Sequence, residues 1–253
     1  MKITSWNVNS LNVRLPHVLQ YLHETAPDIL GLQELKQTDA AVDTTAIEAA
    51  GYHIATHGQK TYNGVALIAR EPLTDVVRGI PGYADEQARA IAASIGDVRV
   101  LNLYVPNGKA VGDEKYTYKL HWLDAATRYI DELKREHPRL IITGDYNIAP
   151  ADLDVHDPDK WRDQILCSAP ERQALQNILA LGFKDAYRAL HPDTQQFSWW
   201  DYRMGGLRRN IGLRIDLTLA SDALALLDAG IDTAPRYWER PSDHAPAWVK
   251  IGA

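Results

Sequence analysis

The chain is poor in cysteine and lacks a long apolar run. It has 253 residues and one cysteine, Cys167, which excludes an intramolecular disulfide and a thiolate-rich zinc site. The segment from Met1 to Trp6 has no basic stretch followed by an apolar one, and no run reaches the roughly 20 apolar residues of a membrane span. We therefore expect a cytoplasmic protein that crosses no membrane, with Cys167 as a small packing residue rather than a nucleophile.

Positive charge is scarce as well, since 27 Lys and Arg residues face 33 Asp and Glu residues and the net charge is −6. Binding to a polyanion depends on Lys and Arg, so this balance argues mildly against nucleic acid. Carboxylates gathered around a cation would, however, add to the same negative balance. Two basic stretches remain, and each is either a nucleic-acid contact or an ordinary solvated surface. They comprise Arg203, Arg208, Arg209 and Arg214, and Lys109, Lys115 and Lys119.

No linker rich in Pro, Gly or Ser and no short repeat divides the chain, and 45% hydrophobic residues can bury a large core. We predict a single domain over residues 1–253. Apolar runs rich in Val, Ile and Leu predict strands at 2–8, 28–32, 65–69, 90–95, 98–105, 140–143, 215–220 and 247–251. Helical patterns lie between them at 15–22, 122–133 and 168–182. This mixture predicts an α/β fold.

Polar side chains follow several predicted strands at the point where each strand ends. They are Asn7 and Asn9, Glu34, Tyr104 and Asn107, and Asp145 and Asn147. Loops at one end of a sheet often build a single site, because the strands fix positions and the loops supply the reactive groups. We therefore expect these side chains to converge in space.

Asp145 and Asn147 share a tight turn that begins at Gly144. An ionised Asp can orient or deprotonate a water molecule, and an Asn amide can donate to a phosphoryl oxygen that gains charge. Asp and Asn are also common turn residues, so the pair has a purely structural alternative. Glu34 lies beside an apolar strand and needs a partner, which is either Mg²⁺, a cation that prefers oxygen ligands, or a nearby Lys or Arg.

A second polar group lies in the last third of the chain. Asp216 falls within a predicted strand, and Asp243 and His244 come just before the final one. An imidazole held by a carboxylate becomes a positioned base, or a cation that faces a phosphate. Aromatic rings in 197–203 precede the arginine stretch and suit unstacked bases or deoxyribose, or else they are core residues.

Seven sequence blocks occur in order over nearly the whole chain. They are 5–14 (SWNVNSLNVR), 32–36 (LQELK), 102–108 (NLYVPNG), 144–150 (GDYNIAP), 198–203 (SWWDYR), 212–216 (GLRID) and 242–246 (SDHAP). Together they resemble the exonuclease III family of DNA-repair nucleases, within the endonuclease, exonuclease and phosphatase superfamily. The resemblance implies a four-layered α/β sandwich of two mixed β-sheets flanked by helices, with the site at one end of the sheets.

The resemblance also implies a metal site, in which Glu34 holds the ion and Asn7 and Asp243 complete its shell. Mg²⁺ is the expected ion and Mn²⁺ a possible substitute; whether one ion or two act stays open. The implied substrate-binding residues are gathered in three loops. They are Asn107, Trp199, Arg208 and Arg209, of which Trp199 matches a sugar pocket and the two arginines lie in a loop that approaches DNA.

For the chemistry, the resemblance implies that Asp145 aligns and deprotonates the attacking water, which Asn147 helps to place. His244, paired with Asp216, contacts the scissile phosphate, as does the phenol of Tyr104. Whether Asp145 or His244 is the general base stays open. In either case water attacks the phosphorus in line with the leaving oxygen.

The implied function is hydrolysis at 3′ ends of double-stranded DNA in base-excision repair, as a 3′–5′ exonuclease, 3′-phosphatase or phosphodiesterase. Cleavage at abasic sites is the main alternative, and a phosphatase on inositol phosphates or lipids is a more remote one. A DNA-binding module without catalysis is disfavoured because Glu34, Asp145, Asp216 and His244 are all present. Nothing in the sequence indicates an obligate oligomer, so we expect a monomer.

Overall fold

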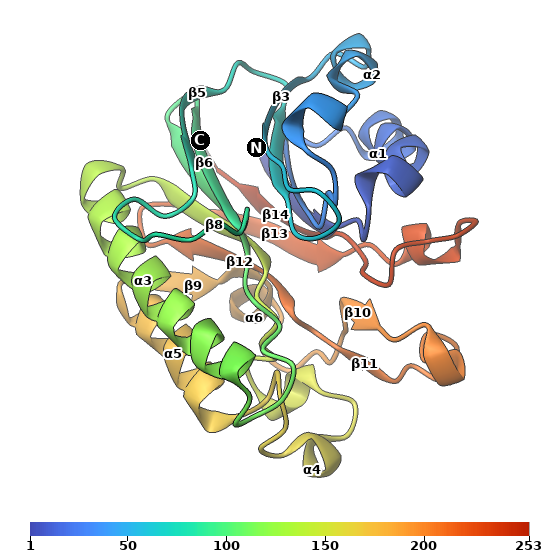
Figure 1. The fold of residues 1–253 in the computed structure, drawn as a ribbon, viewed down its shortest axis with the longest axis vertical. Coiled ribbons are helices and arrows are strands. Elements are labelled where there is room, and N and C mark those ends of the chain that lie inside the picture. The colour runs from blue at the N-terminus through green and yellow to red at the C-terminus, as the bar shows by residue number, and fades with distance from the viewer. Residues whose placement is uncertain (253) are drawn as a thin grey trace.

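Two β-sheets pack face to face in the computed structural model, which describes residues 1–252. Figure 1 shows helices on the outer side of each sheet, which gives four layers. Helices α1 (Leu11–Thr25) and α2 (Thr44–Ala49) cover one sheet, and α3 (Glu114–Glu136) and α5 (Ala169–Ala180) cover the other. The predicted four-layered α/β sandwich is confirmed.

The first sheet has the strand order β13 (Leu226–Ile231), β14 (Ala247–Ile251), β1 (Lys2–Asn7), β2 (Ile29–Gln33), β4 (Val65–Ala69) and β3 (His53–His57). The second has the order β5 (Thr74–Arg78), β6 (Ala90–Ile95), β7 (Val98–Tyr104), β8 (Leu140–Asp145), β12 (Asp216–Ser221) and β9 (Phe183–Asp185). A small ribbon joins β10 (Trp199–Trp200) to β11 (Gly212–Leu213). The short helices and 3₁₀ turns are α4 (Pro158–Trp161), α6 (Ala186–Leu190), η1 (Asp39–Ala41), η2 (Asp152–Asp154), η3 (Arg203–Gly205) and η4 (Ala234–Tyr237).

The central strands are buried on both faces, which explains why apolar residues occupy consecutive positions in them, as in Val65–Ala69. In β4, Leu67 lies in the core between the sheets, whereas Ile68 packs with the residues of α1 and α2. In β7, Val100 lies between the sheets and Leu101 packs with the residues of α3. Successive residues of one strand therefore belong to two different cores.

The long helices have defined starts and apolar inner faces. The Asp113 carboxylate accepts a hydrogen bond from the Lys115 N–H at the start of α3, and Trp122 and Ile130 are buried beneath this helix. The predicted start of α5 is confirmed, since Glu171 accepts from the Ser168 N–H at 3.1 Å. Within residues 1–252, no helix has both the length and the apolarity to cross a membrane.

Strand directions bring the polar strand ends of both sheets together. β1 runs parallel to β2, with Asn7 in register with Gln33, and β7 runs parallel to β8, with Tyr104 in register with Asp145. β12 begins at the same edge, because Asp216 lies opposite Asp145 in their antiparallel pair. The two sheets therefore deliver their polar ends to one side of the molecule.

The sequence pattern does not predict β3, β5, β9, β10, β11 or β13, which lie at sheet edges or in the short ribbon. Strand ends also differ from the expected ones: β8 extends through Asp145, and β12 begins at Asp216 rather than at residue 215. The catalytic candidates Asp145 and Asp216 are thus terminal residues of paired strands, which restrains them more than a loop would.

Two residues of the basic stretches are buried, so their assignment to a charged surface was wrong. Arg214 is 0% exposed and pairs with Asp154 at 2.7 Å and with both carboxylate oxygens of Asp185 at 2.7 and 3.0 Å. Lys119 is also 0% exposed and pairs with Glu171. A charge is tolerated in such surroundings because it is matched by opposite charge and hydrogen bonds.

Arg214→Met should lower the free energy of unfolding by about 3–5 kcal/mol, because it takes the cation from the partly buried Asp185 and one of two cations from the fully buried Asp154. Urea denaturation followed by fluorescence measures this change. Arg209→Met, at an exposed position without an ion pair within residues 1–252, should change it by no more than about 0.5 kcal/mol. Equal effects of the two substitutions would refute the structural role of Arg214.

Candidate active site

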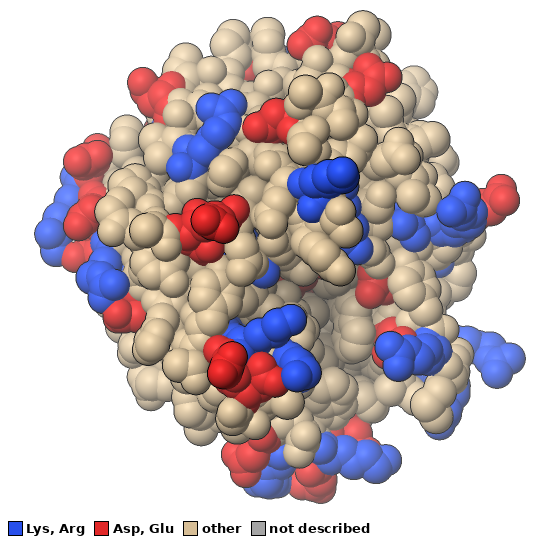
Figure 2. Space-filling view, in the orientation of Figure 1, with Lys and Arg blue, Asp and Glu red and all other residues tan. Residues whose placement is uncertain are grey.

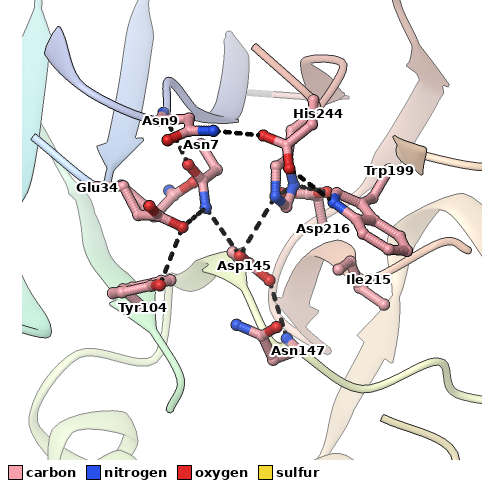
Figure 3. Close-up of polar contacts among 12 residues, drawn as sticks. Asn7, Asn9, Glu34, Tyr104, Asp145, Asn147, Trp199, Ile215, Asp216 and His244 are labelled. Atoms are coloured by element: carbon pink, nitrogen blue, oxygen red, sulfur yellow. Dashed lines mark hydrogen bonds and ion pairs between the residues drawn. The ribbon is translucent and has the colours of Figure 1, made fainter. Parts of the chain in front are cut away.

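The ends of β1, β2 and β8 are joined by one side-chain amide. The Nδ2 of Asn7 donates to Glu34 Oε1 and to Asp145 Oδ2, each at 2.9 Å, as Figure 3 shows. Its Oδ1 accepts from the backbone N–H of Asn9 at 3.0 Å, which fixes the orientation of the amide. Asn7 therefore bridges two acids from different sheets.

Two further side chains contact Glu34. The phenol of Tyr104 donates to Glu34 Oε1 at 2.9 Å, and Lys36 Nζ lies 2.9 Å from Glu34 Oε2. Burial, followed by the charges of Glu34 and Asp145, raises the pKa of Tyr104 well above its usual range. Tyr104 is accordingly a neutral hydrogen-bond donor at every physiological pH. Glu34 thus forms an ion pair with a nearby Lys, one of the two alternatives that the sequence left open, and it also accepts hydrogen bonds from Asn7 and Tyr104.

The turn after β8 is held in a left-handed backbone conformation. Gly144 is required because a Cβ there would lie 2.0 Å from the carbonyl oxygen of Leu103. Asn147 has φ 49°, and its backbone N–H donates to Asp145 Oδ1 at 2.9 Å. Its side chain donates to the Val105 carbonyl and accepts from the exposed Asn107, both at 3.0 Å. The predicted pairing of carboxylate and amide is thus a defined local structure.

His244 lies between two carboxylates. Its Nδ1 is 2.9 Å from Asp216 Oδ2, and its Nε2 is 3.8 Å from Asp145 Oδ2. Ser198 fixes Asp216 in turn, since its hydroxyl donates to Asp216 Oδ2 at 2.6 Å. The result is a chain of polar groups from Ser198 through Asp216 and His244 to Asp145.

These neighbours shift the protonation equilibria of the buried groups. Burial raises the pKa of Asp145 to about 7, with a further contribution from Asp216 and opposition from His244 and Asn7. Burial alone would lower the pKa of His244, but Asp216 and Asp145 outweigh it and raise that pKa to about 10. At neutral pH the imidazole is therefore a cation beside a carboxylate that readily takes up a proton.

Asp243 joins the cluster through Asn9 and Trp199. It accepts from the Asn9 amide at 2.9 Å and from the indole N–H of Trp199 at 3.0 Å. Burial would raise its pKa, but His244 and these two donors hold it below the usual range. Trp199 is only partly buried, so one part of its ring system faces solvent beside the acids.

Known proteins are similar to this chain in sequence and in fold. Residues 4–244 match the sequence model of the Endonuclease/Exonuclease/phosphatase family. The chain belongs to this family. Exodeoxyribonuclease III of Haemophilus influenzae is 38% identical over an alignment of 267 positions, which covers 99% of this chain and 100% of the relative.

Two solved structures extend the comparison, and both align with 100% of this chain and 100% of their own. The 3′-phosphatase NExo from Neisseria, bound to a product DNA hairpin, has a TM-score of 0.99 and 46% identity. An AP endonuclease from Archaeoglobus fulgidus has a TM-score of 0.96 and 36% identity. Within the family, the predicted membership of the exonuclease III group is confirmed.

Arg208 and Arg209 stand apart from the cluster. Both are exposed in the loop between β10 and β11, and within residues 1–252 their side chains form no ion pair. Figure 2 shows basic side chains over this loop, at the right of the view, and a mixture of acidic and basic groups elsewhere on that face. The structure therefore brings the predicted catalytic and metal residues together, and leaves the two arginines on a separate projection.

Lys36 and Ser198 belong to the site although they were not predicted to lie in it, and Asn9, which was expected to converge with the other strand-end side chains, was given no role there. Lys36 donates to Asn9 Oδ1 at 2.6 Å and pairs with Glu34, and Ser198 holds Asp216. Each lies within two residues of a predicted site residue in the sequence. Lys and Ser residues commonly lie close in sequence to polar residues in any chain. The sequence alone therefore does not mark such a residue as part of the site, and the folded structure is needed to show it.

The donor set fits a hard divalent cation. Four acids meet at the site, and within residues 1–252 only Lys36 and His244 form ion pairs with them. The acids are Glu34, Asp145, Asp216 and Asp243. Asp145, Asp216 and His244 place ligand atoms within 4.8 Å of one another, yet His244 Nδ1 is already committed to Asp216. Carboxylate and amide oxygens are therefore more suitable ligands than this imidazole, and the family to which the chain belongs is metal-dependent.

Asp216→Asn should lower the pKa of His244 from about 10 toward or below its usual value near 6.5, since burial then acts without the principal anion. The imidazole would become neutral at neutral pH. NMR titration of the ring protons in metal-free protein measures this. Ser198→Ala keeps the carboxylate and should leave the pKa high, whereas a fall of the same size would assign the effect to disturbed packing.

Proposed function

We propose that this protein hydrolyses phosphate esters at the 3′ ends of double-stranded DNA, leaving a 3′ hydroxyl, as a Mg²⁺-dependent enzyme of base-excision repair. Removal of a 3′ phosphate and removal of a 3′ nucleotide both break a bond between phosphorus and a 3′ oxygen. One site can therefore serve both reactions. Enzymes of the same group act on DNA according to their names, including an exodeoxyribonuclease III and a 3′-phosphatase.

The position of His244 between Asp216 and Asp145 is the observation that carries the proposal. The imidazolium supplies a positive charge for a non-bridging phosphoryl oxygen, and Asp216 keeps it protonated. The neighbouring Asp145 has a pKa near 7, which suits a group that takes a proton from water near neutral pH. The two groups thus have separate tasks, and we assign the general base to Asp145.

Other residues of the cluster place the reactants. Asn147 and Asp145 point from the same turn, so the amide can orient the water that Asp145 deprotonates. The new bond joins the water oxygen to phosphorus as the bond from phosphorus to the 3′ oxygen breaks on the opposite side. The water proton passes to Asp145, and the leaving 3′ oxygen takes a proton from solvent to give the 3′ hydroxyl. Tyr104 stays neutral, and its hydroxyl can turn from Glu34 to donate a hydrogen bond to a phosphoryl oxygen.

Glu34, Asn7 and Asp243 are the residues that we propose to hold Mg²⁺, with Mn²⁺ as a substitute. When bound, the ion neutralises charge on the phosphate and polarises its bond to the leaving oxygen. The excess of acids over cations in the cluster supports this assignment. The Lys36 ammonium, which pairs with Glu34, would also interact with the negative charge of the bound phosphate.

DNA would contact Trp199, Asn107 and the loop between β10 and β11 that carries Arg208 and Arg209, which we call the arginine loop. Trp199 offers a partly exposed aromatic surface next to the acids, and Arg208 and Arg209 are exposed cations without an acidic partner within residues 1–252. We propose that the enzyme acts as a monomer in the cytoplasm. The single buried thiol of Cys167 is compatible with that reducing compartment.

The proposal is tested with end-labelled duplexes that carry a recessed 3′ hydroxyl, a 3′ phosphate or an abasic site, with Mg²⁺ or with a chelator. Asp145→Asn should reduce turnover by at least about 10²-fold while keeping the shape of the side chain. Asp193→Asn, at an exposed acid outside the cluster, should retain full activity. Activity that survives the chelator, or survives Asp145→Asn, would refute the mechanism.

Incision at abasic sites is the second candidate activity. It is favoured by the likeness to the AP endonuclease from Archaeoglobus fulgidus and uses the same bond cleavage. The duplex panel separates the two: faster turnover of the abasic duplex than of both 3′-end substrates would make incision the main activity.

Arg208→Ala combined with Arg209→Ala should weaken DNA binding and flatten its dependence on salt, by a slope of about 0.9 for each phosphate that the variant no longer neutralises. Binding titrations at several salt concentrations measure the slope. Arg128→Ala with Arg135→Ala removes the same charge from exposed positions on the outside of α3 and should leave the slope unchanged. Equal slopes in both variants would show that the loop arginines bind no phosphate.

A further inference from the structure

Lys119 is a buried lysine that has no role in any step of the hydrolysis proposed above. It lies on α3, and its side chain has no exposed surface. Its aliphatic part passes under the loop that follows β7. A Cβ at Gly108 would lie 3.1 Å from Lys119 Cδ and 2.9 Å from Ile165 Cδ1. Gly108 thus leaves the space through which the lysine reaches the active-site loops.

The ammonium group of Lys119 uses all three of its protons. It donates to the backbone carbonyl of Asn147 at 2.7 Å, to that of Asn107 at 3.2 Å, and to the carboxylate of Glu171. Within residues 1–252, no other group donates to either carbonyl. One cation therefore ties together the two loops that carry Asn107 and Asn147.

Glu171 fixes the cation from the opposite side. Its Oε1 also accepts from the Leu166 N–H at 3.1 Å, and its Oε2 accepts from the N–H of Ser168 at 3.1 Å and from the Ser168 hydroxyl at 2.5 Å. The hydroxyl of Tyr116 on α3 lies 2.8 Å from the Ser168 hydroxyl. The ion pair is thus anchored to the start of α5, which does not itself enter the active site.

Asn147 depends on an external restraint. It has φ 49°, a left-handed conformation that asparagine tolerates better than most residues but that still costs free energy, so contacts around the turn help to hold it there. The same residue aims its backbone N–H at Asp145 Oδ1. A shift of this turn would therefore displace both the amide that places the water and the carboxylate that deprotonates it.

Stability alone does not account for this buried pair, because apolar side chains of similar volume commonly stabilise a fold as well or better. We propose that Lys119, held by Glu171, is a positioning residue that sets the orientation of Asn147 and Asn107 for catalysis. This inference rests on the hydrolysis proposed above, and its test keeps the two claims separate.

The principal variant combines Lys119→Met with Glu171→Met, which removes both charges and keeps the volume. Its kcat on a 3′-phosphate duplex should fall by roughly 10- to 100-fold, since small misplacements of reacting groups have large effects on rate. KM should change by less than about threefold, because Asn107 is the only one of the proposed DNA contacts that this pair touches, and Trp199 and the arginine loop stay in place. Ile130→Ala, a cavity on the same helix away from both loops, should leave kcat unchanged.

A mutant cycle separates positioning from general loss of structure. In an Asn147→Ala background the paired substitution should lower kcat by less than about twofold further, because its effect passes through Asn147. A full additional loss in that background, or an unchanged kcat in the folded double variant, would overturn the inference. Absence of DNA hydrolysis by the unmodified protein would instead refute the proposed function.

Two glycine substitutions test the same contact without touching the charges. Gly108→Ala would press on Lys119, whereas a Cβ at Gly112, at a similar φ of 88°, meets no atom within 4 Å. Both carry the strain of a left-handed backbone, but only Gly108→Ala should lower kcat, by roughly fivefold or more. Should the double methionine variant fail to fold, equal kcat values in these two variants would overturn the inference on their own.

Discussion

The active site depends on the burial of one carboxylate at the junction of the two sheets. Asp145 is 1% exposed, and an ionised acid in that position requires donors on every side. Its partners come from separate parts of the fold: the Asn7 amide at the end of β1 and the backbone N–H of Asn147 beyond β8 donate hydrogen bonds, and the imidazole of His244 before β14 places a positive charge 3.8 Å away. Satisfying this one group fixes the relative positions of three chain segments, and thereby most of the site.

The molecule treats buried charge in two ways, and the difference separates structure from chemistry. Around Arg214, and around Lys119 with Glu171, cations and anions are matched and every contact is short. Around Asp145 the acids outnumber the cations. Burial, with a contribution from Asp216, raises the pKa of Asp145, and the carboxylates of Asp216 and Asp145 raise that of His244. Matched charge gives a rigid support in which each cation has its anion. Unmatched charge gives groups ready to bind a metal ion and to exchange a proton.

The sequence predicts the fold where burial imposes a pattern on it. Strands such as β4 and β8 lie between two cores and therefore contain runs of consecutive apolar residues, whereas β5 and β13 expose several of their residues and carry no such run. The acids and amides of the site could be predicted because they stand where buried strands end. Lys119 and Arg214 could not, since their partners are far away in the chain: Glu171 lies 52 residues from Lys119, and Asp154 lies 60 residues from Arg214.

Burial of charged residues leaves the negative balance on the surface of the protein. Four cations are buried, Lys119, Arg214, Arg236 and Arg99, and so are four acids, Asp145, Asp154, Glu171 and Asp216, so the surface keeps the balance of −6. A surface on which acids outnumber cations attracts a polyanion weakly, and most of the selectivity for DNA must come from the geometry of the site rather than from long-range attraction. Weak, salt-sensitive contacts through the arginine loop suit a substrate that is recognised at an end. Long stretches of duplex would demand a basic surface, and the face in Figure 2 carries instead a mixture of charges.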